Sequence, residues 1–142
     1  MNRVLNWTLA AAAAVALSGC AGMNLPTAVP TFGGALCQKY CSSLQSITTA
    51  GDCDAATGAC LTYLKDAEAV FTKLKADLPA SEPADGVRLG TLNSALSSIG
   101  QFKPNCSSPK ATDNLNTTQC KIGTTAVRTA AGTLFANLQV GG

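Results

Sequence analysis

Six cysteines between residues 37 and 120 constrain the fold of this chain more than any other feature. They are Cys37, Cys41, Cys53, Cys60, Cys106 and Cys120. An even set in an exported chain predicts three disulfides, because an oxidising compartment keeps thiols paired. At about 2 to 4 kcal/mol each, three bridges are comparable to the whole stability of a small domain. Metal or redox chemistry is disfavoured, because the sequence has no CxxC motif and no histidine.

The N-terminus indicates that the chain is exported. Arg3 supplies a positive charge, and the stretch from Val4 to Leu17 is apolar apart from Asn6 and Thr8. This is the shape of a secretory signal, and it is too short to span a membrane. The stretch ends in Leu17-Ser18-Gly19-Cys20, which resembles the lipobox of bacterial lipoproteins. The resemblance implies cleavage before Cys20, acylation of that cysteine with palmitate-type chains, and a stable lipid anchor, because two or more chains hold a protein durably on a membrane.

Ala21 follows the lipidated cysteine. In lipoproteins of bacteria with two membranes, an aspartate at this position commonly retains the protein at the inner membrane. The resemblance therefore implies an outer-membrane location facing the periplasm.

The sequence divides into three parts: a signal peptide (1–19), a lipidated flexible tether (20–33) and a single helical domain (34–142). The tether contains two prolines, two glycines and no periodicity. Its thirteen residues after the anchor reach roughly 43 Å when extended. As an alternative, Leu25, Val29 and Phe32 fold back on the domain or on the lipid surface.

Apolar residues recur at helical spacing in four stretches of the domain, and no stretch alternates convincingly as a strand. The pattern predicts helices over 34–48, 54–78, 81–99 and 112–138, with Asp54 and Ser81 as N-caps, a stop at Gly100 and a loop over 101–111. The last helix is expected to bury Cys120, Val127, Ala130, Ala131, Leu134 and Leu138, backed by Ile122 and Phe135. We therefore predict an all-α fold, a small disulfide-stapled bundle of about four helices built from two antiparallel hairpins.

Helical geometry also predicts a disulfide pairing. Cys37 and Cys41 lie about 5 to 6 Å apart on one helix face, beyond the reach of a bridge. Cys53 and Cys60 are about 10.5 Å apart if both lie in one helix. A nested pairing across a helical hairpin, Cys37 with Cys60 and Cys41 with Cys53, avoids both problems and leaves Cys106 with Cys120. A competing solution pairs Cys41 with Cys60 and joins Cys37 and Cys53 to the last helix and its loop.

Composition excludes several classes of function. The absence of histidine removes the usual general base, and the scattered basic residues give neither a nucleic-acid stripe nor a polybasic lipid patch. Asp66 and Glu68 are two residues apart on a predicted helix and point to different faces, so they are expected to be solvated surface rather than a glycosidase dyad. Asp52 and Asp54 flank Cys53 and are expected to cap a helix rather than bind a divalent cation. We expect no cofactor, no metal site and no catalytic residue.

Two classes of function fit these features. The favoured one is a membrane-anchored, non-enzymatic binding or structural module for a protein partner in the envelope, of the assembly, inhibitor or exclusion type. The alternative is a periplasmic carrier or sensor that holds a small apolar ligand between the helices, behind Tyr40, Tyr63 and Phe71. A packed core with an exposed apolar patch favours the first class, and a cavity favours the second.

Overall fold

The computed structural model describes residues 34–79 and 83–140, so the predicted signal peptide, tether, Cys20 and Ser81 cap lie outside the described residues. The described part folds into four α-helices and two short 3-10 helices, and it contains no strand. These are α1 (Gly34–Thr49), α2 (Ala59–Asp77), α3 (Pro83–Phe102), η1 (Lys103–Cys106), η2 (Lys110–Thr112) and α4 (Asn114–Val140). The all-α, disulfide-stapled helical bundle predicted from the sequence is confirmed.

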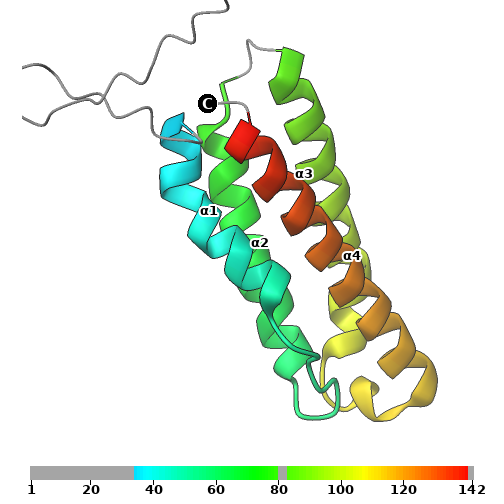
Figure 1. Ribbon diagram of the computed structural model, residues 1–142. Helices are drawn as coiled ribbons and strands as arrows, with labels where there is room; N and C mark the ends of the chain where they lie inside the picture. The colour runs from blue at the N-terminus through cyan, green and yellow to red at the C-terminus, as the bar shows by residue number, and fades with distance from the viewer. Residues whose placement is uncertain (1–33, 80–82, 141–142) are drawn as a thin grey trace, which may run out of the picture.

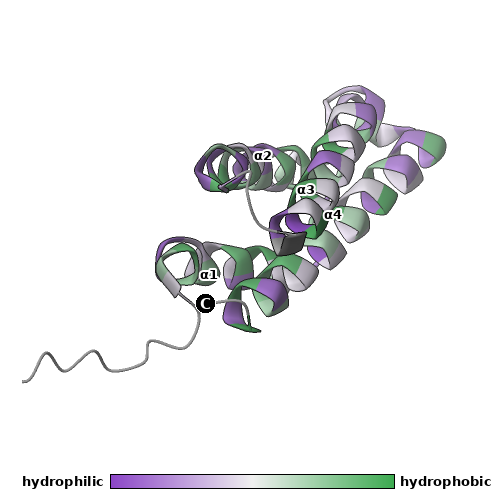
Figure 2. Cartoon of the chain, turned by 90° about the horizontal axis from the view of Figure 1, so that it is seen from above, coloured by the Kyte–Doolittle hydropathy of each residue, from purple (hydrophilic) through white to green (hydrophobic). Residues whose placement is uncertain are grey.

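The four helices run alternately down and up the bundle (Figure 1). α4 packs mainly on α1 and α3, and α2 packs on both of its neighbours in sequence. The loop 50–58 and the segment 103–113 lie together at one end, whereas α1 begins and α4 ends at the other (Figure 1). Seen from above, hydrophobic and hydrophilic residues follow one another along each helix, as expected when each helix buries one face (Figure 2).

α2 begins at Ala59, five residues later than the sequence pattern predicts, because the chain first makes a turn over residues 55–58. Asp54 holds this turn: its Oδ1 accepts a hydrogen bond from the backbone N–H of Ala56 at 2.9 Å. Gly58 then occupies the N-cap position with φ of 80°, a left-handed conformation that other residues adopt at a cost. The prediction that Asp54 caps α2 is therefore wrong.

α3 continues through Gly100 to Phe102, so the predicted stop at Gly100 is also wrong. A helical glycine costs only about 1 kcal/mol, which packing on the neighbouring helices offsets. The segment predicted as a loop over 101–111 contains the end of α3, η1 and part of η2. Asp113 then precedes α4, and its Oδ1 accepts the backbone N–H of Leu115 at 3.1 Å, as a helix N-cap does.

One hydrophobic core runs along the bundle axis. Its largest fully buried side chains include Leu44 from α1, Leu64, Phe71 and Leu74 from α2, Leu92 and Ile99 from α3, and Val127 and Leu134 from α4. The predicted apolar stripe of α4 supplies most of its core residues, since Val127, Ala131, Leu134 and Leu138 are all buried. Ile122 differs from prediction, since 47% of it is exposed rather than packed behind the core face of α4.

All six cysteines of the domain are bridged, and the predicted pair Cys106–Cys120 is confirmed. This bridge joins η1 to α4 and closes the longest of the three loops, so it restricts the unfolded chain most. It is expected to raise the free energy of unfolding by about 3 kcal/mol. The nested pairing of Cys37 with Cys60 and Cys41 with Cys53 is wrong, and so is its competitor. The other two bridges are local, Cys37–Cys41 and Cys53–Cys60.

Neither local bridge was expected from the sequence, because regular helix geometry would hold the two cysteines of each pair too far apart. Cys53 lies outside α2, in the loop that turns back before it, so its Cα stands 4.9 Å from that of Cys60. Cys37 and Cys41 lie in the first two turns of α1, where their Cα atoms are 4.6 Å apart. Both distances fall within the range of about 4.4 to 6.8 Å that a disulfide spans.

Candidate functional site

The acidic residues singled out in the sequence form no catalytic pair. Glu68 Oε2 lies 2.6 Å from the Nζ of Lys103, so it links α2 to η1. Asp66 is exposed on the surface of α2. The structure therefore gives these two carboxylates separate environments, as their two-residue spacing predicts.

Asp52 and Asp54 remain near each other in the loop before α2, but each has another role. Asp52 is almost wholly exposed and its Oδ1 lies 3.6 Å from Nη1 of Arg128. Asp54 holds the turn described above. Across residues 34–79 and 83–140 no group of three or more His, Cys, Asp or Glu side chains is placed to hold a metal ion.

A groove of about 530 Å³ opens between α1 and α2 beside Tyr40. The Tyr40 hydroxyl and the Lys39 ammonium both donate to Oδ2 of Asp77, each at 2.5 Å. The bond from Lys39, and after it the bond from Tyr40, holds the pKa of Asp77 below its ordinary value. The same contacts with Asp77 raise the pKa of Lys39 and that of Tyr40. These three side chains tie the start of α1 to the end of α2.

A buried ion pair within α3 lies near the end of the bundle where α4 finishes, and its arginine also binds α4. Asp85 and Arg88 are 2% and 7% exposed, and their Oδ1 and Nη1 atoms are 2.9 Å apart. Arg88 Nη2 also donates to the backbone carbonyl of Asn137 at 2.9 Å, in the last turns of α4. The C-terminal carbonyls of a helix lack intrahelical partners, so a cation there is favourable. We read this pair as structural.

Sequence reasoning did not single out Asp85 and Arg88, although a signal was present. They precede Leu92, Ala95 and Ile99 at steps of three and four residues, which is the spacing of the buried stripe of α3. Because they are charged, both residues were expected at the surface, since charged side chains are rarely buried unless they are paired.

A second groove, of about 580 Å³, runs between α3 and α4 on the outside of the bundle. Its lining contains no charged side chain and no side chain larger than threonine. The residues are Gly90, Thr91, Ser94, Ala95 and Ser98 of α3, and Ala126, Thr129, Ala130 and Thr133 of α4.

The threonines of this groove are less polar than their sequence suggests. Thr129 and Thr133 each donate their hydroxyl to the carbonyl four residues earlier in α4, at 3.0 and 3.1 Å. Thr91 bonds the carbonyl of Val87 in the same way at 3.0 Å. Because the hydroxyl protons are used within the helices, these residues add methyl groups but no free donor to the groove.

The groove continues towards the start of α4 as an apolar surface. Leu115 and Ile122 are 67% and 47% exposed there, among the few large exposed hydrophobic side chains of the described residues. A third depression, of about 490 Å³, surrounds Ile122 and shares Ala126 with the α3–α4 groove. We call this surface the neutral face. It comprises the nine groove residues together with Thr118, Ile122 and Thr125 of the third depression and the exposed Leu115 near the start of α4. Lys121 also lines the third depression.

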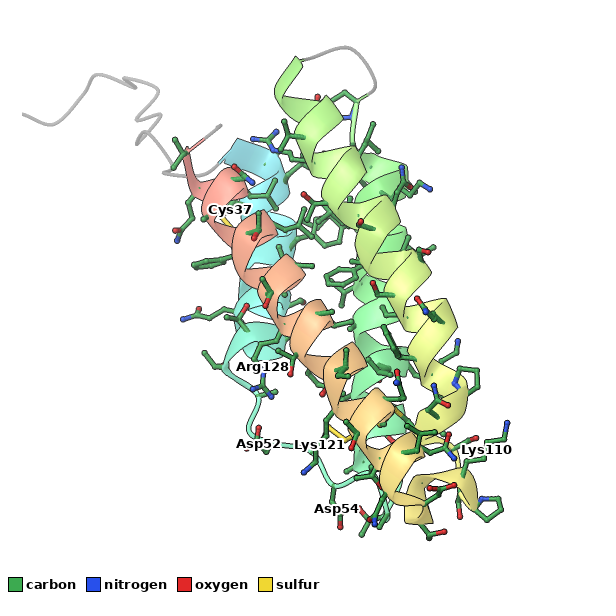
Figure 3. All side chains as sticks on the ribbon, turned by 90° about the vertical axis from the view of Figure 1, so that its right-hand side faces the viewer. Cys37, Asp52, Asp54, Lys110, Lys121 and Arg128 are labelled. Carbon is green, nitrogen blue, oxygen red and sulfur yellow. A yellow bond between two sulfur atoms is a disulfide. The ribbon has the colours of Figure 1, made fainter. Side chains whose placement is uncertain are left out.

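Charged residues are absent from the lining of the α3–α4 groove, whereas Lys121 lines one side of the depression around Ile122. α4 carries two charged residues, Lys121 and Arg128, which are seven residues apart and so lie along one edge of the helix. Figure 3 looks onto α3 and α4 and shows both near the loop that carries Asp52. Arg128 is held there, since its Nη2 donates to the carbonyl of Gly51 at 3.1 Å. α2, in contrast, carries six charged residues within nineteen.

Cys20, the lipidation site predicted from the sequence, lies outside the described residues. None of the helices among the described residues is both long and apolar enough to cross a membrane. Comparison with known proteins finds no family model, no curated protein and no solved structure that matches the chain.

Proposed function

We propose that this protein is a non-enzymatic lipoprotein of the bacterial envelope that binds a protein partner through its neutral face. The observation that carries the proposal is this face: a groove without charged lining residues over two packed helices, with two large apolar side chains exposed at one end. Surfaces of this kind favour contact with another protein, because burying apolar groups stabilises a complex and the groove holds no charge that would have to be desolvated.

The anchor in this proposal is Cys20, acylated after cleavage of residues 1–19. Fourteen residues separate the anchor cysteine from α1, counting Cys20 itself, and they extend to roughly 46 Å at most. A bundle on such a tether can turn its side towards a partner on the same membrane. By the identity of Ala21, that membrane is the outer membrane and the domain faces the periplasm.

A carrier of a small apolar ligand is the less supported function. It requires a cavity behind Tyr40, Tyr63 and Phe71, but Phe71 has no exposed surface and packs within the core. Tyr63 donates its hydroxyl to the carbonyl of Ile47 at 3.0 Å, which keeps it in the α1–α2 contact. The groove beside Tyr40 opens at the surface and has two lysines and an aspartate in its lining.

The anchor is tested by replacing Cys20 with alanine and fractionating the cells. We expect the variant in the soluble fraction, whereas the parent sediments with membranes and resists a salt wash. The matched control replaces both Cys37 and Cys41 with alanine, which removes their disulfide and leaves the lipobox intact, so this protein stays with the membranes. A Cys20→Ala protein that still sediments and resists salt contradicts the anchor.

The binding role is tested by photo-crosslinking in the native host. A benzophenone amino acid at Ser98, in the neutral face, is expected to give a covalent adduct with another polypeptide when the cells are irradiated. The control carries the same probe at Asp66, on the charged surface of α2. If Ser98 gives no adduct, or both positions give the same set of adducts, the neutral face is not the binding surface.

A further inference from the structure

We infer that the partner at the neutral face is a second copy of this chain, bound across a twofold axis that passes near Ala126. The inference rests on the proposed function, since it takes the neutral face to be a protein-binding surface. It adds the identity of the partner and the geometry of the contact.

The distribution of charge on α3 and α4 favours a second copy of the same chain. In a twofold contact the same patch is used by both copies, so residues near the axis meet themselves. A charged side chain there would meet a like charge, which costs several kcal/mol. The α3–α4 groove, which contains Ala126, has no charged residue in its lining. Lys121, which lines one side of the depression at Ile122, and Arg128 lie together along one edge of α4. The surface is therefore suited to a copy of itself, whereas the charge-rich α2 is not.

The order of large and small residues along α4 makes its surface complementary to itself. Ile122, Ala126 and Ala130 follow one another at steps of four, so they form a ridge on the helix surface. When two such ridges cross in antiparallel sense about Ala126, Ile122 of one copy lies beside Ala130 of the other. The exposed isoleucine then fills the space left by small residues. Identical four-residue ridges on both helices belong to the packing class with a crossing angle of about −50°.

The small side chains of the neutral face permit a helix of a second copy to approach closely. Glycine, alanine and serine let helix axes come near one another, and the threonine methyl groups provide contact without free donors to satisfy. Gly90, on the α3 side of the groove, has no atom within 4 Å of where a Cβ would stand. This open space accommodates the flank of a crossing helix.

The size of the face sets the strength of the contact. A helix of twenty residues is about 30 Å long, and two helices packed 8 to 10 Å apart present a width of about 18 Å. The flat area is then about 550 Å² per copy, below the roughly 800 Å² of a standard stable interface. The expected dimer is weak in solution. Confinement to one membrane by a shared lipid anchor raises the effective concentration and favours it.

The test uses the intact chain in its producing cells, as two co-expressed copies with different epitope tags. A benzophenone amino acid at Thr129 is expected to join the two tags in one covalent band on irradiation, and the same probe at Asp66 is not. Adding Ala126→Asp to both copies is expected to lower the yield about tenfold or more, because like charges then meet at the axis. Ala126→Lys in both copies has the same expected effect.

Pairing one Ala126→Asp copy with one Ala126→Lys copy is expected to restore the doubly tagged band, since opposite charges now meet. Circular dichroism of each purified variant checks that the bundle still folds. If Thr129 yields no doubly tagged band but does crosslink another protein, the inference fails and the proposed function stands. If Thr129 yields neither product, both fail. Loss of the band in the mixed pair, with both variants folded, refutes the twofold geometry at Ala126.

Discussion

Replacing Gly123 with alanine provides the sharpest test of how closely the helices pack. Gly123 is buried on α4 where this helix passes the end of α3. A Cβ built at Gly123 would overlap the Cβ of Phe102 and stand 3.0 Å from its Cγ and 3.3 Å from its Cδ2. Carbon atoms pack best at about 3.5 to 4.0 Å, so Phe102 has to retreat by about 1 Å.

Two opposing effects decide the result. Alanine is a better helix former than glycine by about 1 kcal/mol, which favours the variant. Overpacking a core site costs about 1 to 3 kcal/mol, and here the cost falls in the upper part of that range. The reason is that the Cβ of Phe102 is fixed to the backbone and cannot rotate away. We expect Gly123→Ala to lower the free energy of unfolding by about 1 to 2 kcal/mol.

Gly100→Ala is the matched control, because Gly100 is also helical but has no atom within 4 Å of its would-be Cβ. It should raise the free energy of unfolding by up to about 1 kcal/mol through helix propensity alone. Denaturant unfolding of the oxidised protein, followed by far-ultraviolet circular dichroism, measures both variants. The reasoning is refuted if Gly123→Ala is as stable as the parent, or if the two substitutions shift stability in the same direction.

Two further predictions concern the charge contact between α1 and α2 and the disulfides. Because the pKa of Asp77 is lowered in the folded state, its contribution to stability is complete above the unfolded pKa of about 3.9 and disappears as the pH falls through the folded value. The stability difference between the parent and Asp77→Asn is therefore expected to be complete at pH 7 and to shrink progressively as the pH falls below about 3.9, whereas Asp66→Asn on the same helix changes little across this range. A difference that does not shrink on acidification contradicts this origin. Digestion with trypsin and an aspartate-specific protease separates all six cysteines of the domain, and mass spectrometry without reduction should find only the local pairs and the η1–α4 pair. A peptide containing Cys41 linked to one containing Cys53 or Cys60 contradicts the structure.

The sequence by itself determined the helical architecture, because the apolar residues of each helix recur at a spacing that only a helix places on one face. Val127, Leu134 and Leu138 were assigned to the buried stripe of the last helix from this spacing, and the structure buries each of them. The pair Cys106–Cys120 was also predictable. Once the other four cysteines are paired among themselves, it is the remaining combination, and its loop is long enough to close without strain.

The Cys53–Cys60 disulfide was not predictable, because its geometry depends on residues that lie outside the regular helix. The turn at residues 55–58 brings Cys53 back to Cys60, and it relies on the left-handed Gly58 and the hydrogen bond to Asp54. The predicted helix begins at residue 54, directly after Cys53, and the separation of about 10.5 Å follows only if both cysteines lie in one helix. Local backbone hydrogen bonding prevailed over the periodic pattern.

Only the tertiary structure decided the candidate site. The small residues of α3 and those of α4 are some thirty positions apart in sequence, and they form one surface because α4 packs beside α3 in the bundle. Ile122 was expected behind the core, but it became the exposed end of that surface because α4 turns its core stripe of Cys120, Val127 and Leu134 inward. Periodicity tells which residues share a face of one helix, whereas a binding surface depends on which faces are covered by neighbouring helices.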